Sequence, residues 1–81
     1  MSQTLRSLDI GQTGTVTAVT AERELKRRIL DMGVIPGARL NVLGCAPLRD
    51  PVSVEISGFV LALRKAEAEH IMVEREERHV W

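Results

Sequence analysis

The chain has few of the residues that stabilise small extracellular domains or build aromatic binding surfaces. Its 81 residues include one cysteine, Cys45, and two aromatic residues, Phe59 and Trp81, with no tyrosine. A single cysteine cannot form an internal disulfide, and small secreted domains usually carry several. Two aromatic residues are too few for the stacking surface of single-strand nucleic-acid binders or for a groove that recognises proline-rich peptides.

The chain also lacks net charge. Eleven basic and eleven acidic side chains give a formal net charge of zero. Proteins that bind nucleic acids gain most of their non-specific affinity by neutralising phosphates with a basic surface. We therefore expect no nucleic-acid partner.

Long apolar runs are absent as well. No stretch approaches the roughly 20 apolar residues that a helix needs to cross a bilayer, and the N-terminus, MSQTLRSLDIGQTG, lacks the basic start and apolar block of a secretory signal. The length suits one small domain over residues 1–81. We expect a cytoplasmic protein that does not insert into the membrane.

The first half of the chain has the pattern of a strand followed by a helix. Residues 14–20, GTVTAVT, are rich in β-branched side chains and predict a strand. The apolar residues that follow recur at spacings of four, four and three: Ala21, Leu25, Ile29 and Met32. This spacing predicts a helix that packs one face on a sheet, with Thr20 as its cap.

Residues 30–40, LDMGVIPGARL, predict a tight reversal of the chain. Gly33 suits the left-handed conformation that often ends a helix. Residues 35–38 fit a type II turn, with Pro36 at its second position and Gly37 at its third. We therefore expect the helix to end at Gly33 and a strand to start near residue 38.

The second half of the chain predicts a series of short strands. They cover residues 38–45, 52–57, 59–64 and 71–75, with a helical turn at 65–70 and a frayed tail at 76–81. The nearly continuous apolar run FVLALR indicates a strand buried on both faces. These elements predict a mainly β fold, a small barrel of about five strands with one α-helix between the first two strands, a short helical turn before the last strand, and a core spanning about residues 5–75.

Several short segments occur together in the order of a known family. They are residues 8–11 (LDIG) leading to Gly14, 28–33 (RILDMG), 36–37 (PG), 46–47 (AP) with 50–51 (DP), and 61–64 (LALR) with 67–68 (EA) and Ile71. In this order, the chain from about residue 5 to residue 73 resembles the ferrous iron transport protein A (FeoA) family. The resemblance implies an SH3-like barrel with a helix between its first two strands.

The resemblance also implies a function in ferrous iron uptake. Its implied partner is the ferrous iron transport protein B, a membrane transporter with a GTP-hydrolysing domain. The same barrel is appended to iron-dependent transcriptional repressors, but 81 residues leave no room for their helix-turn-helix and dimerisation domains. We therefore expect a stand-alone accessory protein that binds the transporter's cytosolic side, peripheral to the membrane, and modulates its assembly or activity.

The sequence predicts neither catalysis nor a built-in metal site. There is no Walker-type glycine loop, and no serine has a histidine nearby in sequence to activate it. The usual nitrogen and sulfur ligands are Cys45, His70 and His79, without CxxC or HxxxH spacing. We expect no required cofactor, although His70 or His79, with Glu76 and Glu77, could hold Fe²⁺ or Zn²⁺ weakly at the surface or between molecules.

Two regions are candidates for contacts with a protein partner. One is the end of the helix with its exit, and the other is the loop between the two prolines: Leu30, Met32 and Val34, and Leu48, Arg49 and Asp50. For each apolar residue the alternative is burial in the core, and shared solvent exposure would indicate an interface.

Two other functions remain alternatives at this stage. One is a metal-sensing module that acts through another protein, and the other is a nucleic-acid-binding small barrel. The sequence leaves open whether the chain forms a homo-oligomer and whether it activates or inhibits its partner.

Overall fold

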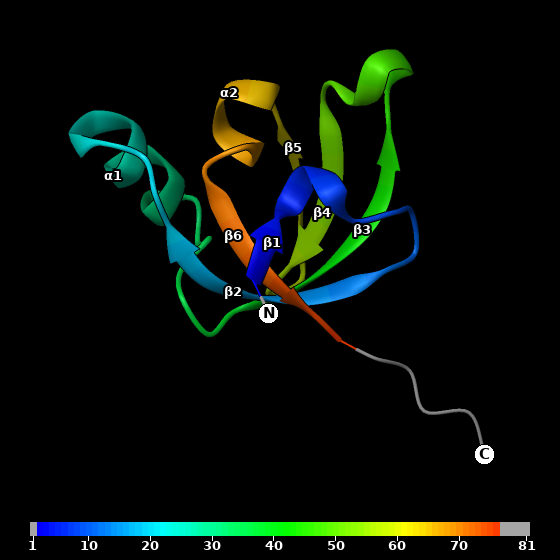
Figure 1. Cartoon of the computed structure of the whole chain (residues 1–81), viewed down its shortest axis with the longest axis horizontal. Coiled ribbons are helices and arrows are strands. Elements are labelled where there is room, and N and C mark those ends of the chain that lie inside the picture. Colours follow the sequence, from blue (N-terminus) through cyan, green and yellow to red (C-terminus); the bar gives the residue numbers. More distant parts are fainter. Residues whose placement is uncertain (1, 77–81) are drawn as a thin grey trace.

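The computed structural model describes residues 2–76, in which one antiparallel sheet of six strands curves around a single core (Figure 1). The strands are β1 (Ser2–Thr4), β2 (Thr13–Val19), β3 (Arg39–Cys45), β4 (Val52–Ile56), β5 (Phe59–Leu63) and β6 (Ile71–Arg75). The helices are α1 (Arg23–Asp31) and α2 (Lys65–Ala68), with 3-10 turns η1 (Leu5–Ser7) and η2 (Pro47–Arg49). The strand order is β1-β6-β2-β3-β4-β5.

The predicted mainly β architecture is confirmed, with α1 between β2 and β3 and α2 directly before β6. The sheet has six strands because β1 pairs with β6, with Gln3 opposite Val73. The sequence did not reveal β1 because its three residues are polar and show no apolar alternation. None of the helices within residues 2–76 is long and apolar enough to cross a membrane.

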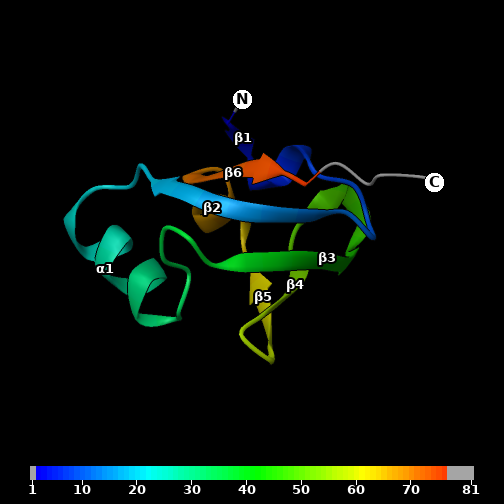
Figure 2. The same ribbon diagram turned by 90° about the horizontal axis from the view of Figure 1, so that it is seen from below.

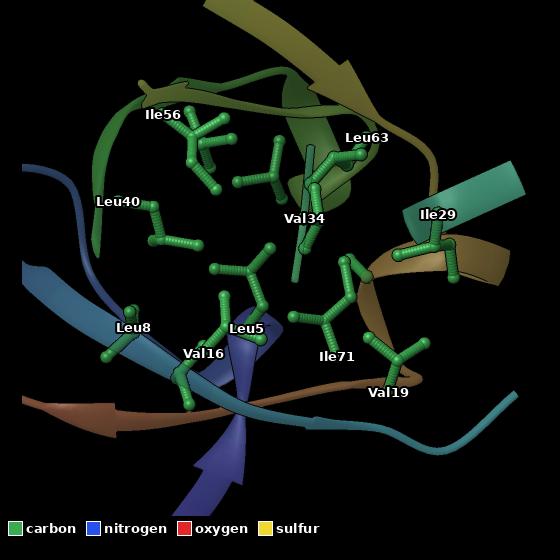
Figure 3. Close-up of a cluster of buried hydrophobic side chains, with 14 of the residues drawn as sticks. Leu5, Leu8, Val16, Val19, Ile29, Val34, Leu40, Ile56, Leu63 and Ile71 are labelled. Carbon is green, nitrogen blue, oxygen red and sulfur yellow. The ribbon is translucent and has the colours of Figure 1, made fainter. Parts of the chain in front are cut away.

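The core is entirely apolar within residues 2–76. Alternating side chains of the strands point into it, as predicted: Leu40 and Val42 from β3, and Val52, Val54 and Ile56 from β4. Figure 3 shows this cluster, to which η1, α1 and β6 also contribute. A chain of 81 residues thus buries side chains from nearly every element in one cluster, so that most core substitutions should affect the whole fold.

The helix α1 packs its apolar stripe on the core but begins later than predicted. Ala21 and Ile29 are buried, whereas Leu25 and Met32 are partly buried against the core. The prediction that Thr20 caps the helix is wrong, because α1 begins at Arg23 and Glu22 occupies the cap position. The N–H and hydroxyl groups of Thr20 instead donate to the His70 carbonyl, at 2.8 and 3.2 Å, and so extend the pairing of β2 with β6.

The predicted reversal after α1 is confirmed. Gly33 and Gly37 have φ values of +93° and +94°, and the Ala38 N–H donates to the Ile35 carbonyl at 3.0 Å, which closes a type II turn. The Gly37 N–H donates to the Val16 carbonyl at 2.7 Å. The reversal is therefore attached directly to β2 as well as to the two elements that it connects.

The prediction that residues 59–64 form a strand buried on both faces is wrong. Phe59 is 69% exposed and Val60 65% exposed, and in β5 only Leu63 is fully buried. β5 lies at the edge of the sheet and pairs with β4 alone, and Figure 2 shows the β4–β5 hairpin extending away from the rest of the sheet. An edge strand whose tip passes beyond the core has no neighbour to cover its apolar side chains.

We predict that Val34→Ala destabilises the fold by about 1–3 kcal/mol, because Val34 is fully buried in the same cluster as Ile29, Leu63 and Ile71 (Figure 3). Ile35→Ala is the matched control, since Ile35 is 49% exposed and its truncation should lower the free energy of unfolding much less. Urea denaturation of the two variants checks this difference. Equal losses of unfolding free energy would contradict the placement of Val34 in the core.

We predict that Gly37→Ala costs about 1 kcal/mol or more, because a residue with a Cβ is strained at a φ of +94°. A Cβ at Gly37 would meet no atom within 4 Å, so the loss measures backbone strain alone. Gly44→Ala is the control, because that site is equally open but has no positive φ. Thermal unfolding should show a lower Tm for the Gly37 variant only, and unchanged stability would refute the turn geometry.

Candidate functional site

The first candidate region, at the exit of α1, belongs mostly to the core. Val34 is fully buried, and Leu30 and Met32 are partly buried and pack against the core cluster. Gly33 turns the chain inward, so that Val34 enters the core directly after the helix. Val34 is therefore excluded as a contact residue, and these three side chains do not form a shared exposed patch.

The second candidate region, the loop between β3 and β4, exposes Leu48. This side chain is 92% exposed, the most open of the large apolar side chains in the described part of the chain. Leu48 and Arg49 have φ values of +65° and +59°, the left-handed region that leucine rarely adopts. Such a conformation costs roughly 1–2 kcal/mol per residue and persists only where surrounding contacts enforce it.

The Arg49 side chain supplies the contacts that hold this loop. Its guanidinium group donates a hydrogen bond to the Leu8 carbonyl and lies 3.7 Å from a carboxylate oxygen of Asp9. Within the loop, the Arg49 N–H donates to the Ala46 carbonyl at 2.9 Å. The loop is thus fastened to the segment between η1 and β2, which lies at the same end of the molecule (Figure 2).

The carboxylate of Asp50 also has a structural role. One of its oxygens accepts a hydrogen bond from the Lys65 N–H at 2.9 Å and lies 3.6 Å from the Arg64 Nε. Asp50 therefore holds the start of α2 against the loop. Of the three predicted loop residues, Leu48 is free to contact a partner, while Arg49 and Asp50 fix the loop in place.

Sequence reasoning missed two residues in the segment to which Arg49 fastens the loop. Asp9 pairs with Arg49, and Ile10, next to it, has an exposed apolar side chain. The Gly11 N–H donates to the Val42 carbonyl at 2.7 Å, which holds this segment beside β3. Asp9 and Ile10 lie about 40 residues from Arg49 in the sequence, so no local pattern could reveal the pairing. We call Asp9, Ile10, Leu48 and Arg49 the Leu48 surface.

The predicted weak metal ligands that the structure describes are far apart. His70 precedes β6 and its Nε2 lies 4.0 Å from Glu69, whereas Glu76 follows β6 and pairs with Arg39. A strand of five residues separates them by roughly 15–20 Å, so they cannot share an ion within one molecule. Glu77 and His79 lie outside the described residues.

Within residues 2–76, no three His, Cys, Asp or Glu side chains are grouped closely enough to hold a metal ion. Cys45 is exposed at the end of β3. The arrangement that the described residues do present is a fixed loop with an exposed leucine beside an Arg–Asp ion pair. Such a surface can bind another protein, since apolar anchors ringed by polar groups are typical of interfaces.

Comparison with known proteins finds relatives that align with most of the chain. A curated relative from Porphyromonas gingivalis, an Fe(2+) transport protein A/Fe(2+) transporter FeoB fusion protein, is 37% identical over 70 residues, which are 86% of this chain and 8% of that protein. The chain therefore spans only a small part of this relative's length.

Two solved structures match the fold along almost their whole length. A FeoA-like protein from Clostridium acetobutylicum has a TM-score of 0.88 and 32% identity, covering 99% of this chain and 93% of that one. FeoA from Stenotrophomonas maltophilia, described as an SH3 domain protein and complexed with zinc, has a TM-score of 0.80 and 25% identity, covering 95% and 99%. The SH3-like fold implied by the sequence resemblance is confirmed.

The model of the FeoA domain matches residues 3–75. This match covers both helices and all six strands except Ser2 at the start of β1, and it includes every residue of the Leu48 surface. The chain belongs to the FeoA domain family, which is associated with ferrous iron transport.

Proposed function

We propose that this chain is a non-catalytic accessory protein of ferrous iron transport, which binds the cytosolic side of a FeoB-type transporter and modulates its assembly or activity. The fusion of the two proteins in the Porphyromonas gingivalis relative supports this association. In a fusion, the linker keeps the two domains at a high effective concentration, so that a contact between them forms readily. A separate chain must achieve the same contact by affinity, and this proposal places it in the cytoplasm beside the transporter.

The observation that carries the proposal is the exposed Leu48 on a loop fixed by Arg49. A loop already held in one conformation loses little entropy when a partner binds it, so more of the contact energy appears as affinity. Burying a leucine side chain contributes roughly 1.5–3 kcal/mol. Leu48 is therefore the proposed anchor, and the Arg49–Asp9 pair forms its polar rim.

Modulation requires more than binding. A ligand can shift the equilibrium between two states of its partner only by its difference in affinity for those states. The proposal therefore requires that the chain bind the nucleotide-bound and nucleotide-free forms of the transporter with different affinities. Co-purification with the full-length transporter and with its cytosolic domain, each with and without nucleotide, tests this requirement. No association in any nucleotide state would refute the proposed function.

We predict that Leu48→Asp weakens binding to the transporter at least about tenfold, equivalent to about 1.4 kcal/mol, because it places a charge where the apolar anchor is buried. Unfolding free energy should change by no more than about 0.5 kcal/mol, since the side chain contacts little in the free protein. Binding can be measured by biolayer interferometry with the immobilised transporter.

Ile35→Asp is the matched control for this variant. Ile35 is also an exposed apolar residue, but it precedes β3 whereas Leu48 follows it, so the length of that strand, roughly 20 Å, separates them. Binding should survive this substitution. An equal loss for both variants, or none for Leu48→Asp, would contradict the proposed anchor.

Arg49→Lys should weaken transporter binding severalfold, because lysine keeps the charge but cannot hold both the Leu8 carbonyl and the Asp9 carboxylate with a planar fork. The loop would then lose the contacts that enforce its left-handed backbone. Hydrogen exchange of the amides in residues 46–51 should become faster in this variant. Unchanged exchange and unchanged affinity together would show that Arg49 does not hold the loop.

Metal sensing is the second candidate function, favoured by the zinc complex of the Stenotrophomonas maltophilia relative. The two candidates differ in their expected response to metal. The accessory function predicts only weak binding of Fe²⁺ or Zn²⁺ at separate surface groups such as His70 and Glu76. Anaerobic calorimetric titration distinguishes them, because one tight site per chain would favour metal sensing.

A further inference from the structure

The two edges of the sheet differ strongly in character. β1, at one edge, is three residues long and polar, which is how natural proteins commonly prevent an edge from pairing with another chain. β5, at the other edge, has five residues, FVLAL, with no charge and no proline. Phe59, Val60 and Ala62 are all exposed on it. An apolar, uncharged edge strand is a template for pairing with a further strand.

The register of the β4–β5 hairpin shows which backbone groups of β5 lack a partner. Ser57 and Gly58 form a two-residue turn with positive φ at both positions, so Ile56 and Phe59 are the hydrogen-bonded pair that flanks it. Hydrogen-bonded and non-hydrogen-bonded pairs alternate along an antiparallel ladder. The N–H and C=O groups of Val60 and Ala62 therefore point away from β4. No other element within residues 2–76 pairs with them.

These groups are arranged so that the β5 edge matches a copy of itself. In an antiparallel pair centred on Leu61, Val60 lies opposite the partner's Ala62, and Ala62 opposite the partner's Val60. Each of these two pairs exchanges two backbone hydrogen bonds, which satisfies all the free N–H and C=O groups of Val60 and Ala62. The two Leu61 side chains, half-buried in the free chain, meet at the centre.

The charges near β5 permit this arrangement. The strand itself carries none, and in this register Arg64 of one copy lies opposite the partner's Gly58 in the hairpin turn. Arg64 is already close to Asp50 of its own chain, at 3.6 Å. No like charges are therefore placed directly opposite one another, a juxtaposition that would destabilise the pair.

We propose that two copies of this chain associate through their β5 edges, in an antiparallel pair centred on Leu61, to form a continuous twelve-stranded sheet. The pairing explains why residues 59–63 have the apolar composition of a covered strand although the single chain leaves most of them exposed. It does not involve the Leu48 surface and does not depend on the transporter-binding proposal.

The area available makes this a weak, concentration-dependent dimer. Phe59, Val60, Leu61 and Ala62 together offer on the order of 300 Å² per copy, so the dimer buries roughly 600 Å² in total. Stable complexes usually bury at least about 1,200 Å². We therefore expect dimers to accumulate only towards millimolar protein, and at higher local concentration wherever several copies gather on one partner.

Amide hydrogen exchange of the unmodified protein, followed over a dilution series from millimolar to micromolar, tests the register directly. The Phe59 and Leu61 amides are bonded to β4 and should be protected at every concentration. The Val60 and Ala62 amides should be protected only at high concentration. Fast exchange of these two amides at every concentration, with a single monomeric species in sedimentation equilibrium, would overturn the proposal. The β5 edge would then be a candidate for pairing with a different protein.

Val60→Lys tests the same pairing by substitution, because lysine on an edge strand opposes pairing. Its dimer dissociation constant should rise at least about tenfold. Leu43→Lys is the matched control, since Leu43 is another exposed apolar residue of the same sheet but lies on β3, two strands from the β5 edge. Leu43→Lys should leave the dimer dissociation constant within about twofold of the value for the unmodified protein. Equal effects of the two variants would contradict association through β5.

Discussion

The pairing of β2 with both β3 and β6 is the interaction on which the rest of this structure depends. It joins the N-terminal half of the chain to its last strand, with Val16 opposite Val73 and Gly14 opposite both Leu40 and Arg75. The reversal after α1 is fastened to the same strand through Val16. The helix and the barrel are thus held together by one central strand.

This arrangement also decides which parts of the surface remain available for contacts with other molecules. The sheet curves around an apolar core. The loop between β3 and β4 and the segment between η1 and β2 lie together at one end of the molecule (Figure 2). Leu48 and Ile10 are exposed there, whereas Leu8 of the second connection is buried in the core. The Arg49 guanidinium group binds these connections to each other, so that Leu48 is presented on a fixed backbone. The hairpin of β4 and β5 extends beyond the core, and its outer strand keeps free backbone groups. The proposed partner contact and the proposed self-association therefore use different parts of the molecule.

Local patterns in the sequence predicted most of the elements. Alternation placed Val52, Val54 and Ile56 correctly, and Gly33 and Gly37 correctly marked the reversal, because these features depend on neighbours in the sequence. The sequence resemblance supplied the barrel topology, which the pattern of apolar and turn residues alone did not predict.

The errors came from contacts between distant residues. An apolar run such as FVLALR looks the same in a central strand and in an edge strand, and its exposure depends on where the hairpin lies in the sheet. Thr20 was assigned to the helix because the carbonyl of His70, fifty residues away, could not be foreseen as its partner. The geometry of the candidate site could be predicted only in part for the same reason. Leu48 could be proposed from its loop, whereas its support by Arg49 and Asp9 required the fold.

The central claim is that this member of the FeoA family contacts the transporter through the Leu48 surface. The most direct measurement is an NMR titration of the isotope-labelled chain with the cytosolic domain of the transporter, with and without nucleotide. The account predicts that the largest shift changes cluster at Asp9, Ile10, Leu48 and Arg49, with an affinity that differs between nucleotide states. Shift changes that cluster elsewhere on the barrel, or no change in any nucleotide state, would contradict it.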